Sequence, residues 1–211
     1  MNETAKQAMK IETTGTMPDG LSYVPDFLSR AEHDHLLSQL RGLEFKHDKF
    51  RGQELKRSYA QFGYSYVTTG RKLSPAPPWP DFLRALSEKG SVHCPEGTIF
   101  SQCIVTRYPH GAGITWHPDA PVFGDCIMAI SLASAALLQL RPNNSEKPTC
   151  EVLTIPGSLY VMRGPARWDY QHQVPQVKAE RYSITMRWVD ESSEIVRKAL
   201  AHTTRVKKKG N

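Results

Sequence analysis

The segment TWHPDAP at residues 115–121 places a histidine and an aspartate two positions apart, with a proline between them. Side chains alternate along a strand, so His117 and Asp119 point the same way where the backbone is extended. Pro118 favours that extension, because a proline disfavours helical backbone at the residue before it. An imidazole and a carboxylate on one face provide two of the three ligands of a facial metal site.

A third ligand has to come from elsewhere in the chain. The best candidate is His172 in the segment DYQHQVP, at the predicted end of a strand. The other histidines lie before the predicted sheet, in a turn or in the tail: His33, His35, His47, His93, His110 and His202. Together with His117 and Asp119, His172 would hold an octahedral ferrous ion and leave three positions open. The alternative is a surface histidine beside a loop aspartate.

The segment RYSITMR at residues 181–187 also suggests a binding site. Strand alternation predicts an apolar face of Tyr182, Ile184, Met186 and Trp188 in a core, and an opposite face of Arg181, Ser183, Thr185 and Arg187. The two arginines would lie about 20 Å apart, with side chains long enough to bend together. Buried guanidinium groups need anions, and carboxylates bind them bidentately. A short dicarboxylate such as 2-oxoglutarate, which also chelates iron, fits these requirements. The alternative is that both arginines reach solvent at sheet edges.

The chain has 211 residues and four cysteines, none of them in a CxxC pair. This length favours one domain, and the cysteines are expected to be reduced, mostly buried thiols. The N-terminus lacks the apolar core of a signal peptide, and no apolar run is long enough to span a bilayer. We therefore expect a soluble, monomeric, intracellular protein without a membrane partner, cytoplasmic in a bacterium and open to a nuclear location in a eukaryote.

The net charge of +6 is concentrated in three segments, namely KHDKFRGQELKR at 46–57, GRKL at 70–73 and the C-terminal TRVKKKGN. The segment KRSYAQFGYSYV interleaves two basic residues with four aromatic ones. Cations hold phosphates and aromatic rings stack on bases, so these clusters favour a nucleic-acid partner. The alternatives are a solvated tail and an amphipathic hairpin that packs its rings inward.

The site residues need a sheet to position them. Residues 1–18 are polar and predicted to be disordered, a helix is expected after the cap Ser29, and a short helix from about residue 79 to 87. From Ile99 onward, eight alternating segments predict an antiparallel sandwich or barrel. They are FSQCIVTRY, ITWHPD, CIMAISLAS, ALLQLRP, CEVLTIP, SLYVMRG, RWDYQHQV and RYSITMRW.

Together these residues resemble the AlkB family of iron(II)- and 2-oxoglutarate-dependent dioxygenases. Five blocks carry the resemblance in order over residues 56–188: GYSYVTTGRKLSPAPPWP, VTRYPHGAGITWHPD, IMAISLASAALLQLR, LYVMRGPARWDYQH and RYSITMR. It implies a mainly β (α+β) fold, a double-stranded β-helix (jelly roll) with N-terminal helices and a nucleotide-recognition lid. We divide the chain into a disordered arm (1–18), an N-terminal helix and lid region (19–98), a catalytic core (99–192) and a basic tail (193–211).

The resemblance also implies the roles of individual residues. The metal ligands and catalytic centre would be His117, Asp119 and His172; the cosubstrate residues would be Thr106, Tyr108, Arg181, Ser183 and Arg187; the substrate residues would be Arg57, Tyr64, Tyr66 and Lys72. Arg181 would hold the distal carboxylate of 2-oxoglutarate and Arg187 the end near the metal. At the positions of Thr106 and Ser183 the family often has asparagine. The hydroxyl groups of Thr106 and Ser183 still provide hydrogen-bonding groups there. Pro121 replaces a second acidic residue of the best-known bacterial member, which leaves the target base open.

The implied activity is oxidative demethylation of N-alkylated bases in nucleic acid, as in alkylation damage repair. Iron(II), 2-oxoglutarate and O₂ would be used, and formaldehyde, succinate and CO₂ released. A base in a duplex would have to be flipped to reach a buried site. The alternatives are the same chemistry on a modified RNA base or a protein side chain, a catalytically silent nucleic-acid-binding jelly roll, and a β-sandwich with chance histidines. The basic charge favours nucleic acid over protein but does not separate DNA from RNA.

Overall fold

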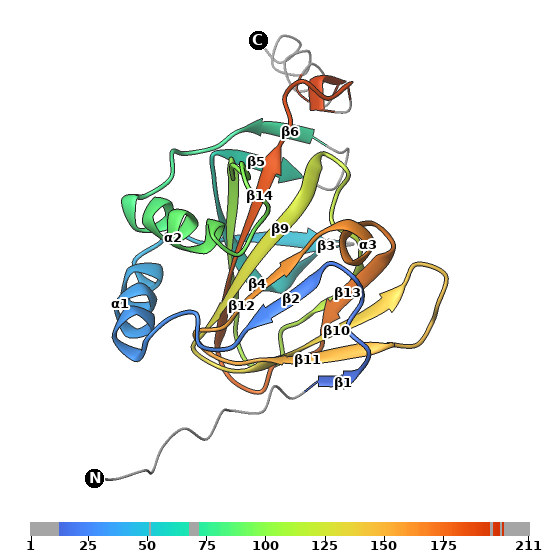
Figure 1. Ribbon diagram of the computed structural model, residues 1–211. Helices are drawn as coiled ribbons and strands as arrows, with labels where there is room; N and C mark the ends of the chain where they lie inside the picture. Colours follow the sequence, from blue (N-terminus) through green and yellow to red (C-terminus); the bar gives the residue numbers. More distant parts are fainter. Residues whose placement is uncertain (1–12, 51, 68–71, 195, 199, 201–211) are drawn as a thin grey trace, which may run out of the picture.

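The computed structural model describes residues 13–50, 52–67, 72–194, 196–198 and 200 (Figure 1). The helices are α1 (Arg30–Arg41), α2 (Asp81–Ser91) and α3 (Gly164–Trp168). The strands are β1 (Thr13–Gly15), β2 (Leu21–Val24), β3 (Lys46–Phe50), β4 (Gln53–Phe62), β5 (Tyr64–Val67), β6 (Lys72–Pro75), β7 (Gln102–Tyr108), β8 (Ile114–His117), β9 (Phe123–Leu132), β10 (Ala136–Pro142), β11 (Cys150–Thr154), β12 (Leu159–Met162), β13 (Tyr170–Val174) and β14 (Arg181–Val189). No helix in these ranges is long and apolar enough to cross a membrane.

Two antiparallel sheets form the body of the molecule. The smaller has the order β1-β11-β10-β13-β8, and the larger has the order β2-β12-β9-β14-β7-β4-β3. A separate two-stranded sheet, β5-β6, is the segment expected to form the lid. The prediction of a mainly β, antiparallel fold is confirmed, and its strands cross over between non-consecutive neighbours as in a jelly roll.

Each face of the larger sheet packs into a different core. Between the sheets, Ile127, Ala129 and Tyr160 pack with residues of β10, β11 and β13. On the outer face, Met128 and Ile184 pack with leucines of α1 and α2, which cover that face (Figure 1). Residues of opposite parity along β9, β12 and β14 therefore face different cores, as strand alternation requires.

Both longer helices begin where local sequence dictates. Ser29 caps α1 in a capping box with Glu32, as predicted for the cap. Helix α2 runs over Asp81–Ser91, later and longer than the predicted 79–87, with Pro80 as its N-cap. It extends further because Gly90 is buried against Met128 of β9, which continues the contact face of the helix.

The structure differs from the predicted division of the chain at both ends. Residues 13–15, inside the arm expected to be disordered, form β1 because their backbone pairs with β11. Val196, in the predicted basic tail, is 1% exposed and packs in a small third core. The other residues of the arm and tail lie outside the described ranges.

The boundary expected at residue 98 does not separate two sheets. Strands β2, β3 and β4, from the predicted helix-and-lid region, are hydrogen-bonded into the larger sheet with the core strands. The basic segment 46–57 forms much of the β3–β4 hairpin, which pairs with β7. The sequence did not show the alternation of apolar and polar side chains in this hairpin, because charged residues lie on both of its faces.

The prediction of an apolar face on β14 is wrong for one residue. Tyr182, Ile184 and Met186 pack in the outer core as predicted, but Trp188 is 41% exposed. The pairing of β14 with β9 shifts register between Arg187 and Val189. Such an irregularity breaks strict alternation, so the ring of Trp188 lies outside the outer core.

Candidate metal and cosubstrate site

The smaller sheet brings the two predicted histidine ligands together. His117 ends β8 and pairs directly with His172 of β13, and their ring centroids are 4.4 Å apart. Asp119 follows β8, and its Oδ2 lies 3.7 Å from Nε2 of His172. Asp119 and His172 are buried, at 7% and 9% exposure. The three residues predicted as ligands therefore meet in one place, although they come from distant parts of the chain.

Both imidazoles are held in the neutral form, which is the form that binds metals. Burial lowers the pKa of His172 to about 3, with His117 adding to the effect and Asp119 opposing it. Burial likewise lowers the pKa of His117. Nδ1 of His117 lies 2.8 Å from the carbonyl oxygen of Thr115. A neutral ring that donates from Nδ1 to this carbonyl keeps the lone pair of Nε2 for a metal.

Asp119 is held as a carboxylate. Burial alone would raise the pKa of Asp119, but Arg187, His172 and His117 bring the pKa well below its usual range. Nη2 of Arg187 lies 2.6 Å from Oδ1 of Asp119. Two neutral imidazoles and one carboxylate are a nitrogen and oxygen donor set that suits iron(II).

In the described ranges, no three histidine, cysteine or acidic side chains are already closed around one point at metal-ligand distance. The ion pair with Arg187 holds one oxygen of Asp119, and the other oxygen lies 3.7 Å from His172. Two adjacent ligand atoms that each lie about 2.1 Å from one ion are only somewhat closer to each other than this Asp119–His172 distance. The residues present therefore fit a metal by chemistry and by position.

Arg167 of α3 fixes the loop that carries Asp119. Its guanidinium group, in a residue 3% exposed, donates to the carbonyl oxygens of Asp119, Ala120, Phe123 and Gly124 at 2.9–3.3 Å. Carbonyl groups in a buried loop need such partners. Arg167 was missed in the sequence because nothing near it indicates which backbone it would reach.

We expect Arg167→Met to lower the free energy of unfolding by about 2–4 kcal/mol, because the buried carbonyl groups lose a charged donor. Chemical denaturation measures the change. Arg163→Met is the matched control, since this neighbouring arginine is exposed, and we expect a loss within about 0.5 kcal/mol. Equal, small losses in both variants would contradict the role of Arg167 in the loop.

The face of the larger sheet that looks toward the smaller one carries rows of polar side chains. Across β7 and β14, Tyr108 pairs with Arg181, Thr106 with Ser183, and Gln102 with Arg187. On the other side of β14, Ser183 pairs with Ser131 of β9. The predicted cosubstrate residues thus lie on one face of the larger sheet, with the two arginines at opposite ends of β14. We call the region between the two sheets that this face borders the chamber.

Arg181 is a buried cation without an anion. It is 2% exposed, its Nη2 donates to Oγ of Ser131 at 2.8 Å, and its guanidinium carbon lies 5.3 Å from the centroid of the Tyr108 ring. Its Nε has no hydrogen-bond partner, and no carboxylate of the described residues forms an ion pair with it. A buried charge is unfavourable unless it is paired, so this end of the chamber suits an anionic group.

Arg187 lies at the metal end. Besides its ion pair with Asp119, its Nη1 donates to Oε1 of Gln102 at 3.2 Å, while its Nε has no partner. The alternative that both arginines reach solvent at sheet edges is therefore excluded. β14 is an interior strand of the larger sheet.

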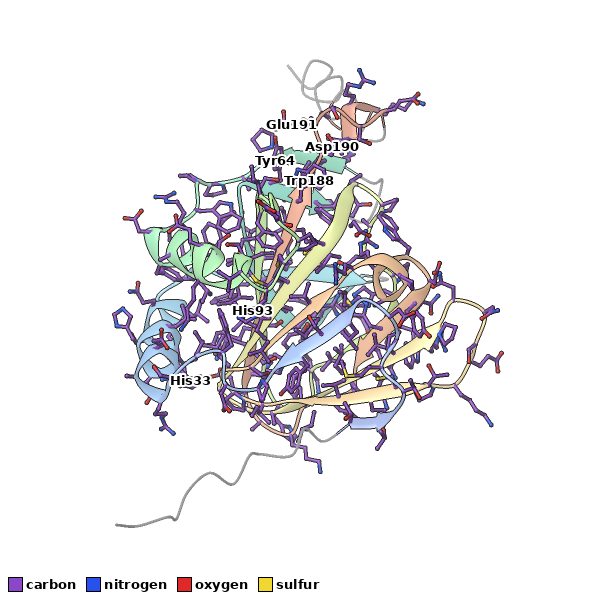
Figure 2. The ribbon with its side chains drawn as sticks, in the orientation of Figure 1. His33, Tyr64, His93, Trp188, Asp190 and Glu191 are labelled. Atoms are coloured by element: carbon purple, nitrogen blue, oxygen red, sulfur yellow. The ribbon has the colours of Figure 1, made fainter. Side chains whose placement is uncertain are left out.

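The predicted substrate residues lie at the lid and on β4. The hydroxyl of Tyr64 donates to Glu191, and this hydrogen bond raises the pKa of Tyr64 to about 12. Figure 2 labels both residues, which lie in the same region of the molecule. Tyr66 packs edge-on against Phe123, with centroids 5.5 Å apart. The β5–β6 sheet is thus attached to the segment after β14 and to the start of β9.

The two predicted basic substrate residues are half-buried. Lys72 begins β6, and Arg57 lies on β4. Burial is the largest cause that lowers the pKa of His117, and the positive charge of Arg57 adds to this effect. Arg57 precedes Ser58, which pairs with Arg107 of β7, and lies within electrostatic range of His117, whereas Lys72 belongs to the β5–β6 sheet.

Three residues of the chamber were missed in the sequence. Ser131 and Gln102 are described above, and Tyr160 is 7% exposed, with burial raising its pKa and with Arg181 and Asp119 near enough to affect it. A signal was present for two of them. Gln102 has the same parity as Thr106 and Tyr108, and Ser131 is a polar residue within the apolar run CIMAISL.

Comparison with known proteins agrees with this chemistry. The family model of the 2OG-Fe(II) oxygenase superfamily matches residues 20–202. The chain is 26% identical over 163 residues to alpha-ketoglutarate-dependent dioxygenase alkB homolog 7, mitochondrial, of Mus musculus, covering 76% of this chain and 69% of that protein. It is 26% identical over 198 residues to alpha-ketoglutarate-dependent dioxygenase alkB homolog 3 of Homo sapiens, covering 82% and 68%.

Two further comparisons give a relative that is named as a probable demethylase and a solved structure with a similar fold. Probable RNA/DNA demethylase ALKBH6 of Danio rerio is 27% identical over 136 residues, covering 64% of this chain and 53% of that protein. The solved structure of OsALKBH1 superposes with a TM-score of 0.62 at 16% identity, covering 82% of this chain and 98% of that chain. The structural likeness confirms the jelly-roll oxygenase fold.

Proposed function

The chain belongs to the 2OG-Fe(II) oxygenase superfamily as an AlkB-like dioxygenase that uses iron(II), 2-oxoglutarate and O₂, and on this premise we propose that it demethylates N-alkylated bases in nucleic acid. His117, Asp119 and His172 would hold the iron. The bound iron supplies the oxidation that converts 2-oxoglutarate and O₂ to succinate and CO₂ and hydroxylates an N-methyl group, which leaves as formaldehyde.

The chamber residues bind and orient the cosubstrate. Arg181 would pair with its distal carboxylate, assisted by Tyr108, and Arg187 would contact the end near the metal. The observation that carries this assignment is that Arg181, a buried cation with no carboxylate partner among the described residues, lies on the same sheet face as Arg187, which pairs with Asp119. Packing of the lid against the start of β9 would help to exclude water from the reacting groups.

Nucleic acid is the substrate class that the charge distribution favours. Lys46, Lys49 and Lys56 are exposed on the β3–β4 hairpin, which continues the larger sheet beyond β7. Arg57, on the same hairpin, lies within electrostatic range of His117 and would contact a phosphate beside a flipped base. The name of the Danio rerio relative includes both RNA and DNA, and both substrates remain within the proposal.

We expect the double variant Arg57→Ala, Lys72→Ala to weaken oligonucleotide binding and to flatten its dependence on salt. Each lost phosphate contact removes roughly 0.7–0.9 from the slope of log K against log salt. Fluorescence anisotropy at several salt concentrations measures that slope. The control removes two exposed charges from other faces, with Arg30→Ala and Lys147→Ala. Equal slopes in the two double variants would contradict the placement of the strand along the lid and β4.

Two substitutions at Tyr64 separate base stacking from attachment of the lid. We expect Tyr64→Ala to reduce turnover of a methylated oligonucleotide, because stacking contributes roughly 1–3 kcal/mol per base. Tyr64→Phe keeps the ring but loses the hydrogen bond to Glu191, and we expect it to keep most of the turnover. Succinate formation without substrate should continue in both variants. A loss in Tyr64→Phe as large as in Tyr64→Ala would show that attachment of the lid, and not stacking, matters.

A further inference from the structure

Gln102 occupies the first position of β7, directly across from Arg187 on β14. Along β7, Cys103 and Val105 pack in the outer core, so Gln102, with Thr106 and Tyr108, faces the chamber between the sheets. Gln102 is 1% exposed. A polar side chain so deeply buried at the metal end needs partners for both of its amide atoms.

Only one of the two amide atoms has a partner. Oε1 accepts a hydrogen bond from Nη1 of Arg187 at 3.2 Å, and Nε2 is buried with no partner among the residues that the structure describes. The orientation of the amide is set by chemistry, since a flipped group would place its NH₂ donor against the guanidinium donors. Nε2 is therefore a donor that lacks an acceptor.

Other glutamine amides in the described ranges do not share this property. On the outer face of the smaller sheet, Nε2 of Gln173 donates to Oε1 of Gln139 at 2.6 Å, and Nε2 of Gln139 donates to Glu151. The buried side-chain nitrogen and oxygen atoms without partners in those ranges are Nε2 of Gln102 and the Nε atoms of Arg181 and Arg187. All three are donors, and all three belong to the chamber.

We propose that Gln102 is a cosubstrate-binding residue, whose Nε2 donates a hydrogen bond to the carboxylate of 2-oxoglutarate nearest Arg187. Three donors without acceptors require a ligand rich in oxygen acceptors, and two guanidinium groups require that ligand to be anionic. The position of Gln102 across from Arg187, and of Arg187 beside Asp119, selects the carboxylate at the 2-oxo acid end. The inference rests on the proposed cosubstrate site and adds a residue to it.

Two substitutions separate the free donor from the acceptor that orients Arg187. Gln102→Glu keeps an acceptor for Arg187 but has no N–H group, whereas Gln102→Met removes both functions without adding charge. The affinity of the manganese(II)-loaded protein for 2-oxoglutarate is measured by calorimetry, and the affinity for manganese(II) alone is measured separately. Gln139→Met is the matched control, because its amide lies on the outer face of the other sheet.

We expect both Gln102 variants to bind 2-oxoglutarate about tenfold more weakly or worse, with manganese affinity and the Gln139→Met control unchanged. Weakening in Gln102→Met alone would show that Gln102 only orients Arg187, and weakening in Gln102→Glu alone would show a charge effect. Either result, or no weakening, overturns the proposal. Failure of the unaltered protein to bind 2-oxoglutarate would instead overturn the cosubstrate site itself.

A measurement on the unaltered protein covers the case in which a variant does not fold. In the zinc(II)-loaded, nitrogen-15-labelled protein, we expect 2-oxoglutarate to shift one glutamine side-chain N–H resonance downfield, as a new charged acceptor does. Gln102→Glu, or Gln102→Met where only that variant folds, assigns the resonance by its loss. Binding of 2-oxoglutarate without such a shift overturns the proposal.

Discussion

His172→Ala is expected to abolish both metal retention and turnover. The variant removes one of two neutral imidazoles and leaves His117 and Asp119 as an incomplete ligand set. Metal content after dialysis and succinate release with added iron(II) measure the two effects. Manganese(II) should raise the melting temperature of the unaltered protein, since a ligand that binds only the folded state stabilises it, and it should not raise that of the variant.

The control for this prediction is His35→Ala. His35 is exposed on α1, which covers the outer face of the larger sheet, so we expect its metal content and turnover to match those of the unaltered protein. Full turnover in His172→Ala, with metal retained, would remove His172 from the site.

Arg181→Ala is expected to raise the concentration of 2-oxoglutarate required for turnover by a large factor. Removing the bidentate partner of a buried carboxylate costs on the order of 2–5 kcal/mol, which corresponds to roughly 30-fold to several thousand-fold in affinity. Titration of succinate formation against 2-oxoglutarate measures the shift. The loss of folding stability should be limited, because the substitution also removes a buried charge that has no ion-pair partner among the described residues.

Arg107→Ala is the matched control for Arg181. Arg107 lies on the neighbouring strand β7 but points away from the chamber, in an exposed ion pair with Glu180, and surface pairs contribute little. We expect its 2-oxoglutarate requirement to be normal. A normal requirement in Arg181→Ala as well would mean that the anion of this chamber is not the cosubstrate.

Local patterns in the sequence predicted the features that depend on neighbouring residues. The cap of α1 at Ser29 and the alternation of Tyr182 and Ile184 against Arg181 are visible within a few positions, and the structure has both. The placement of His172 beside His117 was also predicted, although it depends on the pairing of β13 with β8, because few other histidines lay near strand ends.

Features that depend on register between distant strands could not be read from the sequence. The ladder from Gln102 through Arg187 to Asp119 joins three separate segments, and no local pattern fixes which residues face each other. The same holds for Arg167, whose partners lie on a loop far from α3 in sequence. Nor could the attachment of Tyr64 to Glu191 be foreseen, since the two are joined only when the chain folds.

We propose that this dioxygenase removes methyl groups from nucleic-acid bases. The most direct test measures formaldehyde and succinate together, with iron(II), 2-oxoglutarate and a panel of N-methylated DNA and RNA oligonucleotides. We predict formaldehyde release in proportion to succinate on at least one methylated oligonucleotide, and none on its unmethylated counterpart or in His172→Ala. Succinate formation without formaldehyde from any oligonucleotide would contradict the claim and direct the search to a protein side chain.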